Sequence, residues 1–196
     1  SSSACLSKSC CFDLSISDMF FTWLNGGTLC VLQEDELYCP SDYINREKIE
    51  FWHSVPTLVD FMYKLNYLKP NMYPSIKYSI FCGEPLTNRI AEAWKNAAPN
   101  STVENLYGPT ETTVFVSRYV YKGKDDNKIL KDDIVPIGKV FDKLDFAIID
   151  KHNKRVSSKE KGELVISGNQ VSKGYIKKRL NNWRSIQTKS VKKKPK

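Results

Sequence analysis

Short apolar runs alternate with helical patterns over the first 121 residues, and this alternation constrains the fold more than any other feature. The intervening patterns are about ten residues long, which suits helices that connect parallel strands. We therefore expect an α/β subdomain over residues 1–121, with a mainly parallel sheet and flanking helices. The runs with the length and composition of strands lie at 4–12, 28–32, 51–54, 78–82 and 102–106.

The helical patterns each carry one apolar face that we expect to be buried. The first begins near Asp13, where Ser15 or Ser17 can cap it, and ends at Gly26-Gly27. We interpret its apolar stripe as core packing. The residues expected on buried faces are Ile16, Met19, Phe20, Trp23 and Leu24 in the first helix, Leu58, Phe61, Met62 and Leu65 after Pro56, and Ile90, Ala91 and Trp94 after Thr87. A short polar helix is expected from Ser41 or Asp42 to about Glu50.

The second part of the chain has a different pattern. Residues 122–133 form a polar, charge-dense stretch without periodicity, which is typical of a loop. Two β-rich segments follow, Leu144–Asp150 and Glu163–Ser167, with a turn at 151–153 between them. This pattern predicts a small antiparallel β subdomain at about 134–180. We therefore divide the chain into domains at 1–121 and 122–180, followed by a basic, disordered tail at 181–196.

Charge and cysteine usage limit the classes of function. The net charge is +8, and six basic residues without an acidic one lie between Arg184 and Lys196. That run could contact nucleic acid or act as a nuclear address, but a solvated, disordered terminus is the better explanation, and we do not expect nucleic acid as a partner. The six cysteines form no C-x-x-C pair and are expected to be reduced thiols. No apolar run has the length of a membrane helix and no signal segment opens the chain, so we expect a cytoplasmic protein without a membrane partner.

One turn in the middle of the chain gathers several chemically useful side chains. An apolar strand pattern ends at Asn105-Leu106-Tyr107, and Gly108-Pro109 cannot continue a strand because proline lacks an N–H. The turn therefore presents an aromatic ring, a hydroxyl and a carboxylate within the span Tyr107–Glu111. Such a group could stack on a base, bind a phosphate and hold a hard cation, although an ordinary Gly-Pro turn explains the same residues.

Other polar residues lie at or just after expected strands. Asp13, His53 and Cys82 share this position with the Tyr107–Glu111 turn. In open α/β sheets, ligands bind beyond the C-terminal ends of the strands. We therefore expect these four segments to face one crevice. The alternatives are that Asp13 only caps a helix and that His53 is an ordinary buried histidine.

Several ordered motifs resemble the adenylate-forming enzymes, which include the adenylation domains of nonribosomal peptide synthetases and the acyl-CoA synthetases. The central motif is N-L-Y-G-P-T-E-T-T-V from Asn105. The combination of F-D-L-S with the cysteine of F-C-G-E is most similar to the D-alanine–carrier-protein ligase branch. The further motifs, in the family's order, are F-D-L-S at 12–15, F-C-G-E at 81–84, P-I-G-K at 136–139 and G-E-L-V-I-S-G-N-Q-V-S-K-G-Y at 162–175.

The resemblance implies that ATP and Mg²⁺ activate a small amino acid as an aminoacyl-adenylate, which the phosphopantetheine thiol of a carrier protein then takes up. It makes Thr110 and Glu111 catalytic and makes Glu111 the metal ligand. It pairs Asp13 with the substrate ammonium group. The nucleotide-binding residues that it implies are Glu84, Asn105, Tyr107, Gly108 and Thr110, and the substrate-binding ones are Asp13, His53, Ile80, Cys82, Leu106, Val114 and Phe115.

The sequence also departs from the family pattern. The phosphate loop that should precede F-D-L-S, the aspartate that holds the ribose hydroxyls and the C-terminal domain with its catalytic lysine are not found in it. We therefore interpret the chain as a central fragment of the family's N-terminal domain and expect that it does not complete adenylation alone. Two alternatives stay open: a peptide-synthetase adenylation fragment, and a non-catalytic nucleotide- or amino-acid-binding remnant. The missing parts of the same enzyme could be supplied by another chain as a partner.

Overall fold

The computed structural model describes residues 3–6, 12–123, 132–157 and 160–175. Expectations for the other residues, including the basic tail at 181–196 and parts of the strand at 4–12 and the loop at 122–133, lie outside this described part. The chain separates into two compact units. Unit 1 comprises residues 1–107 and 117–139, and unit 2 comprises residues 108–116 and 140–196. Each unit is described by itself below.

The sheet of unit 1 confirms the predicted fold class. Its strand order is β2-β1-β3-β4-β5-β6-β7. The pairs from β2 to β5 are parallel, and β5 pairs with β6 in the antiparallel direction. The bounds are β1 (Ser3–Leu6), β2 (Thr28–Val31), β3 (Phe51–Ser54), β4 (Tyr78–Phe81), β5 (Thr102–Tyr107), β6 (Ser117–Tyr121) and β7 (Lys139–Val140).

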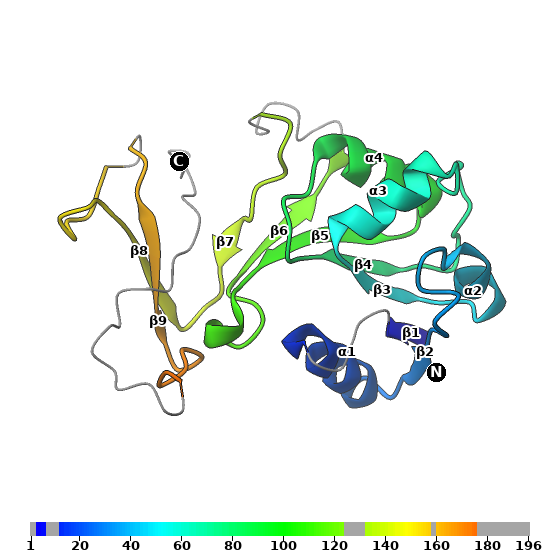
Figure 1. Ribbon diagram of the computed structural model, residues 1–196, viewed down its shortest axis with the longest axis horizontal. Coiled ribbons are helices and arrows are strands. Elements are labelled where there is room, and N and C mark those ends of the chain that lie inside the picture. The colour runs from blue at the N-terminus through cyan, green and yellow to red at the C-terminus, as the bar shows by residue number, and fades with distance from the viewer. Residues whose placement is uncertain (1–2, 7–11, 124–131, 158–159, 176–196) are drawn as a thin grey trace. The chain divides into compact units, whose positions relative to one another are not determined.

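Helices α3 (Pro56–Lys64) and α4 (Asn88–Ala97) cover one face of this sheet (Figure 1). Both helices begin as the sequence predicts: proline opens α3, and the Thr87 hydroxyl accepts a hydrogen bond from the Ile90 amide at 3.4 Å. The buried face of α3 is only partly as expected. Val59 and Met62 are buried, whereas Phe61 and Leu65 are 43% and 46% exposed.

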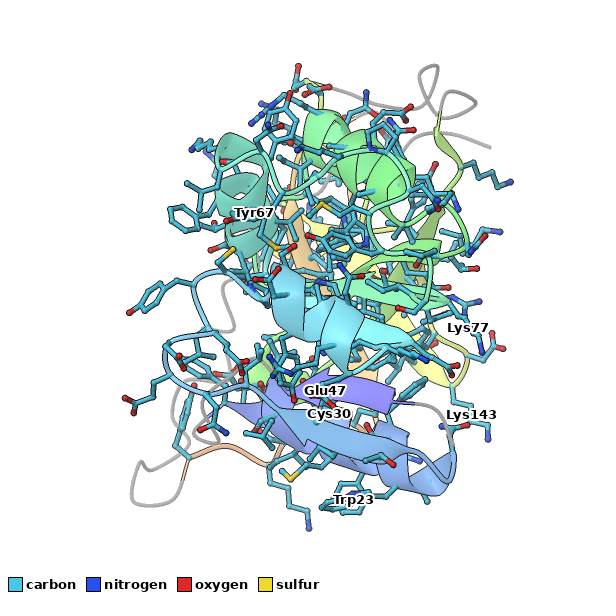
Figure 2. All side chains as sticks on the ribbon, turned by 90° about the vertical axis from the view of Figure 1, so that its right-hand side faces the viewer. Trp23, Cys30, Glu47, Tyr67, Lys77 and Lys143 are labelled. Carbon is cyan, nitrogen blue, oxygen red and sulfur yellow. The ribbon has the colours of Figure 1, made fainter. Side chains whose placement is uncertain are left out.

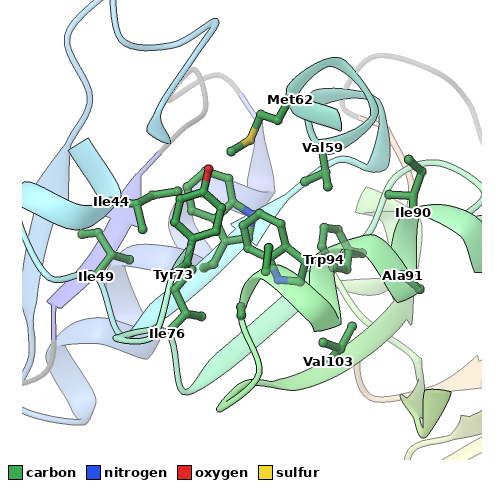
Figure 3. Packing of buried hydrophobic residues seen from close by; sticks show 14 of the residues in the cluster. Ile44, Ile49, Val59, Met62, Tyr73, Ile76, Ile90, Ala91, Trp94 and Val103 are labelled. Atoms are coloured by element: carbon green, nitrogen blue, oxygen red, sulfur yellow. The ribbon is translucent and has the colours of Figure 1, made fainter. Parts of the chain in front are cut away.

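The main core lies beneath these two helices, and Trp94 is at its centre (Figure 3). Its ring is fully buried and lies 5.4 Å from the Trp52 ring, 5.5 Å from Tyr73 and 5.8 Å from Phe81, measured between centroids. The indole N–H donates to Ser79 Oγ at 2.8 Å. Because its polar atom is paired, the whole side chain can be buried without an unsatisfied donor.

Helix α1 (Asp13–Leu24) lies on the opposite face, and here the predicted core stripe is wrong. Ile16, Phe20, Trp23 and Leu24 are 50%, 56%, 55% and 82% exposed, and Figure 2 shows Trp23 on the outer side of the molecule. The buried residues of α1 are polar: Ser15, Asp18 and Thr22. They lie at i, i+3 and i+7 and so share one face of the helix. The side of α1 that faces inward is therefore its polar side, from which Asp18 contacts His53 of β3.

The predicted caps of α1 and α2 are also wrong. Phe12 is the N-cap of α1 and makes no side-chain cap, whereas the Ser15 hydroxyl donates back to the Phe12 carbonyl at 2.7 Å. Helix α2 (Ser41–Arg46) begins after Pro40 and is shorter than predicted. In both helices the hydroxyl residue that seemed able to cap lies inside the helix.

In unit 2, β8 (Leu144–Ile149) and β9 (Glu163–Gly168) form a two-stranded antiparallel sheet, in agreement with the predicted β pairing. The register joins Leu144 to Gly168 and Ile149 to Glu163. Among the described residues of both units, every helix is too short or too polar to cross a membrane.

Candidate functional site

Strands β3, β4 and β5 end beside one another, which brings several predicted site residues to one edge of the sheet in unit 1. The register pairs His53 with Ile80 and Phe81 with Asn105. Cys82 directly follows β4 as a buried thiol, and Tyr107 is the last residue of β5. Parallel strands point their carboxyl ends in the same direction, so these residues share the edge where α/β sheets bind ligands.

Side-chain alternation sorts the predicted residues between the two faces of the sheet. Register partners point to the same face, so His53, Ile80 and, from β5, Leu106 lie on the face that α1 covers. Asp13 is the first residue of α1 and is half-buried. A carboxylate in the first helical turn is favoured by the helix dipole. Three of the predicted amino-acid-binding residues of unit 1 therefore lie on one face, with Asp13 at the start of the helix above it.

A buried acid–imidazole pair joins α1 to this face. Asp18 Oδ1 is hydrogen-bonded to His53 Nδ1, and the side chains of these residues are 0% and 1% exposed. Next to this pair, the ring of Phe21 stacks on that of Phe51 at 4.4 Å between centroids. Sequence reasoning missed Asp18. The signal that could have found it is the polar stripe of Ser15, Asp18 and Thr22 at helical spacing.

A second buried carboxylate on this face, that of Glu104, is already held by neighbouring strands. Glu104 is 3% exposed, and its Oε1 lies 3.6 Å from Arg118 Nη1. Burial, followed by the hydrogen bond to Glu104, raises the pKa of Tyr78 to about 12. Since Arg118 and Tyr78 already contact Glu104, Asp13 remains the better candidate for pairing with an incoming ammonium group.

Two of the residues predicted to bind nucleotide have structural contacts in unit 1. Glu84 Oε2 accepts from the Thr57 amide at 3.0 Å and from the Thr57 hydroxyl, and thereby caps the start of α3. The Asn105 side-chain amide donates to the carbonyls of Val135 and Pro136, each at 3.1 Å. These contacts place the two side chains in the framework around the strand ends, and their roles toward a nucleotide stay predictions.

The predicted turn is unusually tight. A Cβ at Gly108 would lie 2.3 Å from the Val114 carbonyl oxygen, so only glycine fits there. Thr110–Thr112 form a single 3₁₀ turn, after which Thr113 and Val114 both adopt left-handed backbone angles with φ of 58° and 68°. For a β-branched residue such as Val114 this conformation costs about 1–3 kcal/mol, and the surroundings must hold it in place.

Glu111 lies in this turn and is half-buried. Its carboxylate accepts a hydrogen bond from the Tyr175 hydroxyl, which is the main cause that lowers the pKa of Glu111 below 4.5. The same bond raises the pKa of Tyr175. Glu111 is therefore ionised at neutral pH. Sequence reasoning missed Tyr175, although it ends the motif that begins at Gly162.

The donor set suits Mg²⁺ better than a metal held by protein alone. Among the described residues, no three His, Cys, Asp or Glu side chains gather to hold a metal ion. Glu111 offers one ionised carboxylate, which is a hard oxygen ligand. Mg²⁺ commonly binds one or two carboxylates together with substrate phosphates and water, so Glu111 fits this pattern. A hollow elsewhere in unit 2, lined by β8 and by residues 155–157 and 160, contains none of the predicted site residues.

Comparison with known protein families identifies the class of the protein. A family model described as "AMP-binding enzyme" matches residues 3–176. The chain therefore belongs to the AMP-binding family of adenylate-forming ligases.

Its relatives give more detail. The chain is 33% identical over 170 residues to the D-alanine–D-alanyl carrier protein ligase of Bacillus velezensis, and 34% identical over 173 residues to that of Lacticaseibacillus rhamnosus. Each match covers 84% of this chain and 33% of the relative, so the chain spans about a third of their length. The adenylation domain AlmE of Vibrio cholerae, solved in complex with glycyl-adenosine-5′-phosphate, matches with a TM-score of 0.83 and 31% identity, over 90% of this chain and 34% of AlmE.

Proposed function

We propose that the chain is part of a ligase that activates a small amino acid, D-alanine first among the candidates, as an aminoacyl-adenylate. The activated acyl group then passes to the phosphopantetheine thiol of a carrier protein. The observation that carries this proposal is the gathering of His53, Cys82 and Tyr107 at the parallel strand ends, in a chain 33% identical to a D-alanine–D-alanyl carrier protein ligase. The glycyl adenylate bound to AlmE supports a small substrate.

In the proposed reaction, the substrate carboxylate attacks the α-phosphorus of ATP, and the bond to pyrophosphate breaks. Such a step needs positioning and neutralised charge more than a strong base. Asp13 pairs with the substrate ammonium group at the start of α1. Ile80, Cys82 and Leu106, together with His53, limit the space for the side chain from the face beneath α1. Apolar walls of this kind discriminate by about 10- to 200-fold per methylene group.

The nucleotide and metal roles belong to the turn and the residues next to it. Tyr107 stacks on adenine, the Thr110 hydroxyl binds the α-phosphate, and Gly108 lets the backbone approach the nucleotide. Glu111 holds Mg²⁺, which draws charge from the phosphates when bound. Val114 and Phe115, both half-buried, belong to the same turn in unit 2, and their contact with the substrate stays a prediction. Glu84 and Asn105 support nucleotide binding indirectly, through their hydrogen bonds to the backbone around the strand ends.

The test measures binding and turnover separately on the 196-residue chain. Calorimetric titration with AMP should give saturable binding, and Tyr107→Ala should weaken it by about tenfold or more, since stacking on one base contributes about 1–3 kcal/mol. Tyr38→Ala is the matched control, because Tyr38 is an exposed tyrosine in unit 1. Absence of AMP binding by the wild-type chain would overturn the proposal.

Turnover distinguishes the two candidate forms of this function. The chain spans about a third of its ligase relatives, and a non-catalytic binding protein is the second candidate. We expect no ATP–pyrophosphate exchange dependent on D-alanine from this polypeptide alone, and exchange only when the remaining parts of the enzyme are supplied. Exchange that depends on glycine or another amino acid instead of D-alanine would favour the peptide-synthetase alternative.

A further inference from the structure

The segment after β9 contacts the Gly108–Val116 turn at several points, all within unit 2. Gln170 Nε2 donates to the carbonyl of Phe115 at 3.1 Å, and more weakly to those of Thr112 and Thr113 at 3.4 and 3.5 Å. In return, the Thr113 hydroxyl donates to the Gln170 carbonyl at 2.8 Å. A single side-chain amide thus donates hydrogen bonds to several carbonyl groups of the turn. We call residues 168–175 the bracing segment.

Two further contacts from the bracing segment reach Glu111 itself. The Ser172 amide donates to the Glu111 carbonyl at 2.7 Å, which fixes the backbone of this residue. The Tyr175 hydroxyl donates to Oε1 of its carboxylate, which fixes the side chain. Backbone and carboxylate of one residue are therefore held by two neighbouring parts of the same segment.

The turn needs such support because of its own conformation. Two successive residues, Thr113 and Val114, have left-handed backbone angles. The carbonyl groups of Thr113 and Phe115, on either side of Val114, both accept from the Gln170 amide group. A strained turn persists only where its surroundings over-determine it. Gln170 supplies two N–H donors, which no apolar side chain can replace.

We propose that Gln170 and Tyr175 are positioning residues for the nucleotide- and metal-binding turn. Gln170 holds the strained backbone after Glu111, and Tyr175 orients the Glu111 carboxylate so that its second oxygen faces a divalent cation. The inference about Tyr175 rests on the proposed role of Glu111 as the Mg²⁺ ligand. The inference about Gln170 concerns the conformation of the turn and holds with or without nucleotide.

The experiment for Gln170 uses amide hydrogen exchange in the full chain without ligand. Gln170→Leu removes both donors and keeps a side chain of similar length, and Gln33→Leu is the control at an exposed glutamine of unit 1. We expect exchange of the Thr112, Thr113 and Phe115 amides, which bond within the turn, to become about tenfold faster in Gln170→Leu only. The α4 amides should not change. Unchanged exchange in the turn would overturn the role of Gln170.

The experiment for Tyr175 compares ATP binding with and without Mg²⁺ by calorimetry. Tyr175→Phe removes only the hydroxyl, and Tyr38→Phe is the control at another exposed tyrosine. We expect Tyr175→Phe to reduce the Mg²⁺-dependent gain in ATP affinity by about tenfold or more, as for loss of one hydrogen bond to a charged group, and to leave Mg²⁺-free binding unchanged.

Each other outcome is decisive. An unchanged or larger Mg²⁺ gain in Tyr175→Phe would overturn the positioning role, and a larger gain would mean that Tyr175 competes with the cation. If the wild-type chain binds ATP under neither condition, the proposed function fails and the role of Tyr175 fails with it. The exchange experiment still decides the role of Gln170 in that case, so the two failures can be told apart.

Discussion

The buried Asp18–His53 pair should be a principal support for the position of α1. We predict that Asp18→Ala destabilises unit 1 by about 3–5 kcal/mol, because it leaves His53 buried opposite an empty space. The estimate depends on burial, and the two side chains are 0% and 1% exposed. An exposed pair would contribute only about 0–1 kcal/mol. Asp35→Ala, at an exposed aspartate of the same unit, should change stability by less than about 0.5 kcal/mol.

The assay is urea unfolding of the full chain followed by the fluorescence of the buried Trp52 and Trp94. With a slope of about 2 kcal/mol per M, the expected cost lowers the midpoint by about 1.5–2.5 M. The double variant with His53→Ala should be at least about 1.5 kcal/mol more stable than the sum of the single changes predicts. A midpoint shift below about 0.3 M, or strict additivity, would refute a buried pair between α1 and β3.

Three further predictions concern the core, the turn and an exposed ion-pair network. Trp94→Ala should cost about 3–5 kcal/mol in the same unfolding assay, whereas a loss under about 1 kcal/mol would contradict a core centred on this ring. Gly108→Ala should abolish AMP binding, because the added Cβ would lie 2.3 Å from a carbonyl oxygen of the turn, and it should leave the urea-unfolding midpoint of unit 1 unchanged. Normal AMP binding by this variant would show that the turn can open. The hydrogen bonds from Lys64 and then Arg89 lower the pKa of Asp60 from 3.8, so their stabilisation is present above about pH 4 and is lost as the pH falls through the lower folded pKa. Asp60→Asn should therefore cost less than about 1 kcal/mol at pH 7 and progressively less as the pH falls below about 4, and a difference that grows toward low pH would contradict this assignment.

The alternation of strands and helices could be predicted from the sequence because both periodicities are local. The strand Phe51–Ser54 has the predicted bounds, and Thr87 caps α4 as expected. The orientation of α1 could not be predicted in this way. Its hydrophobic pattern favours burial of Phe20 and Trp23, yet the contact of Asp18 with His53 of β3, distant in sequence, turns the polar side of the helix inward. Tertiary pairing overrides periodicity there.

The candidate site shows the same division between local and non-local information. The tight turn at Gly108 follows from glycine and proline, which act within a few residues. The contacts of Gln170 and Tyr175 with that turn join residues more than fifty positions apart, and no local pattern contains them. The roles of Asp13 and Cys82 toward a substrate stay predictions.

The central claim is that the strand ends of unit 1 bind a small amino acid, and titration of the isotopically labelled chain with D-alanine in the presence of AMP tests it most directly. We predict saturable shifts of amide resonances that cluster at Asp13, His53, Cys82 and Leu106. The Asp13→Asn substitution should weaken the binding of D-alanine by about tenfold or more. Asp145→Asn, on β8 of unit 2, is the control and should bind as the wild type does. The absence of saturable shifts, or shifts confined to the hollow beside Arg155, would contradict the account.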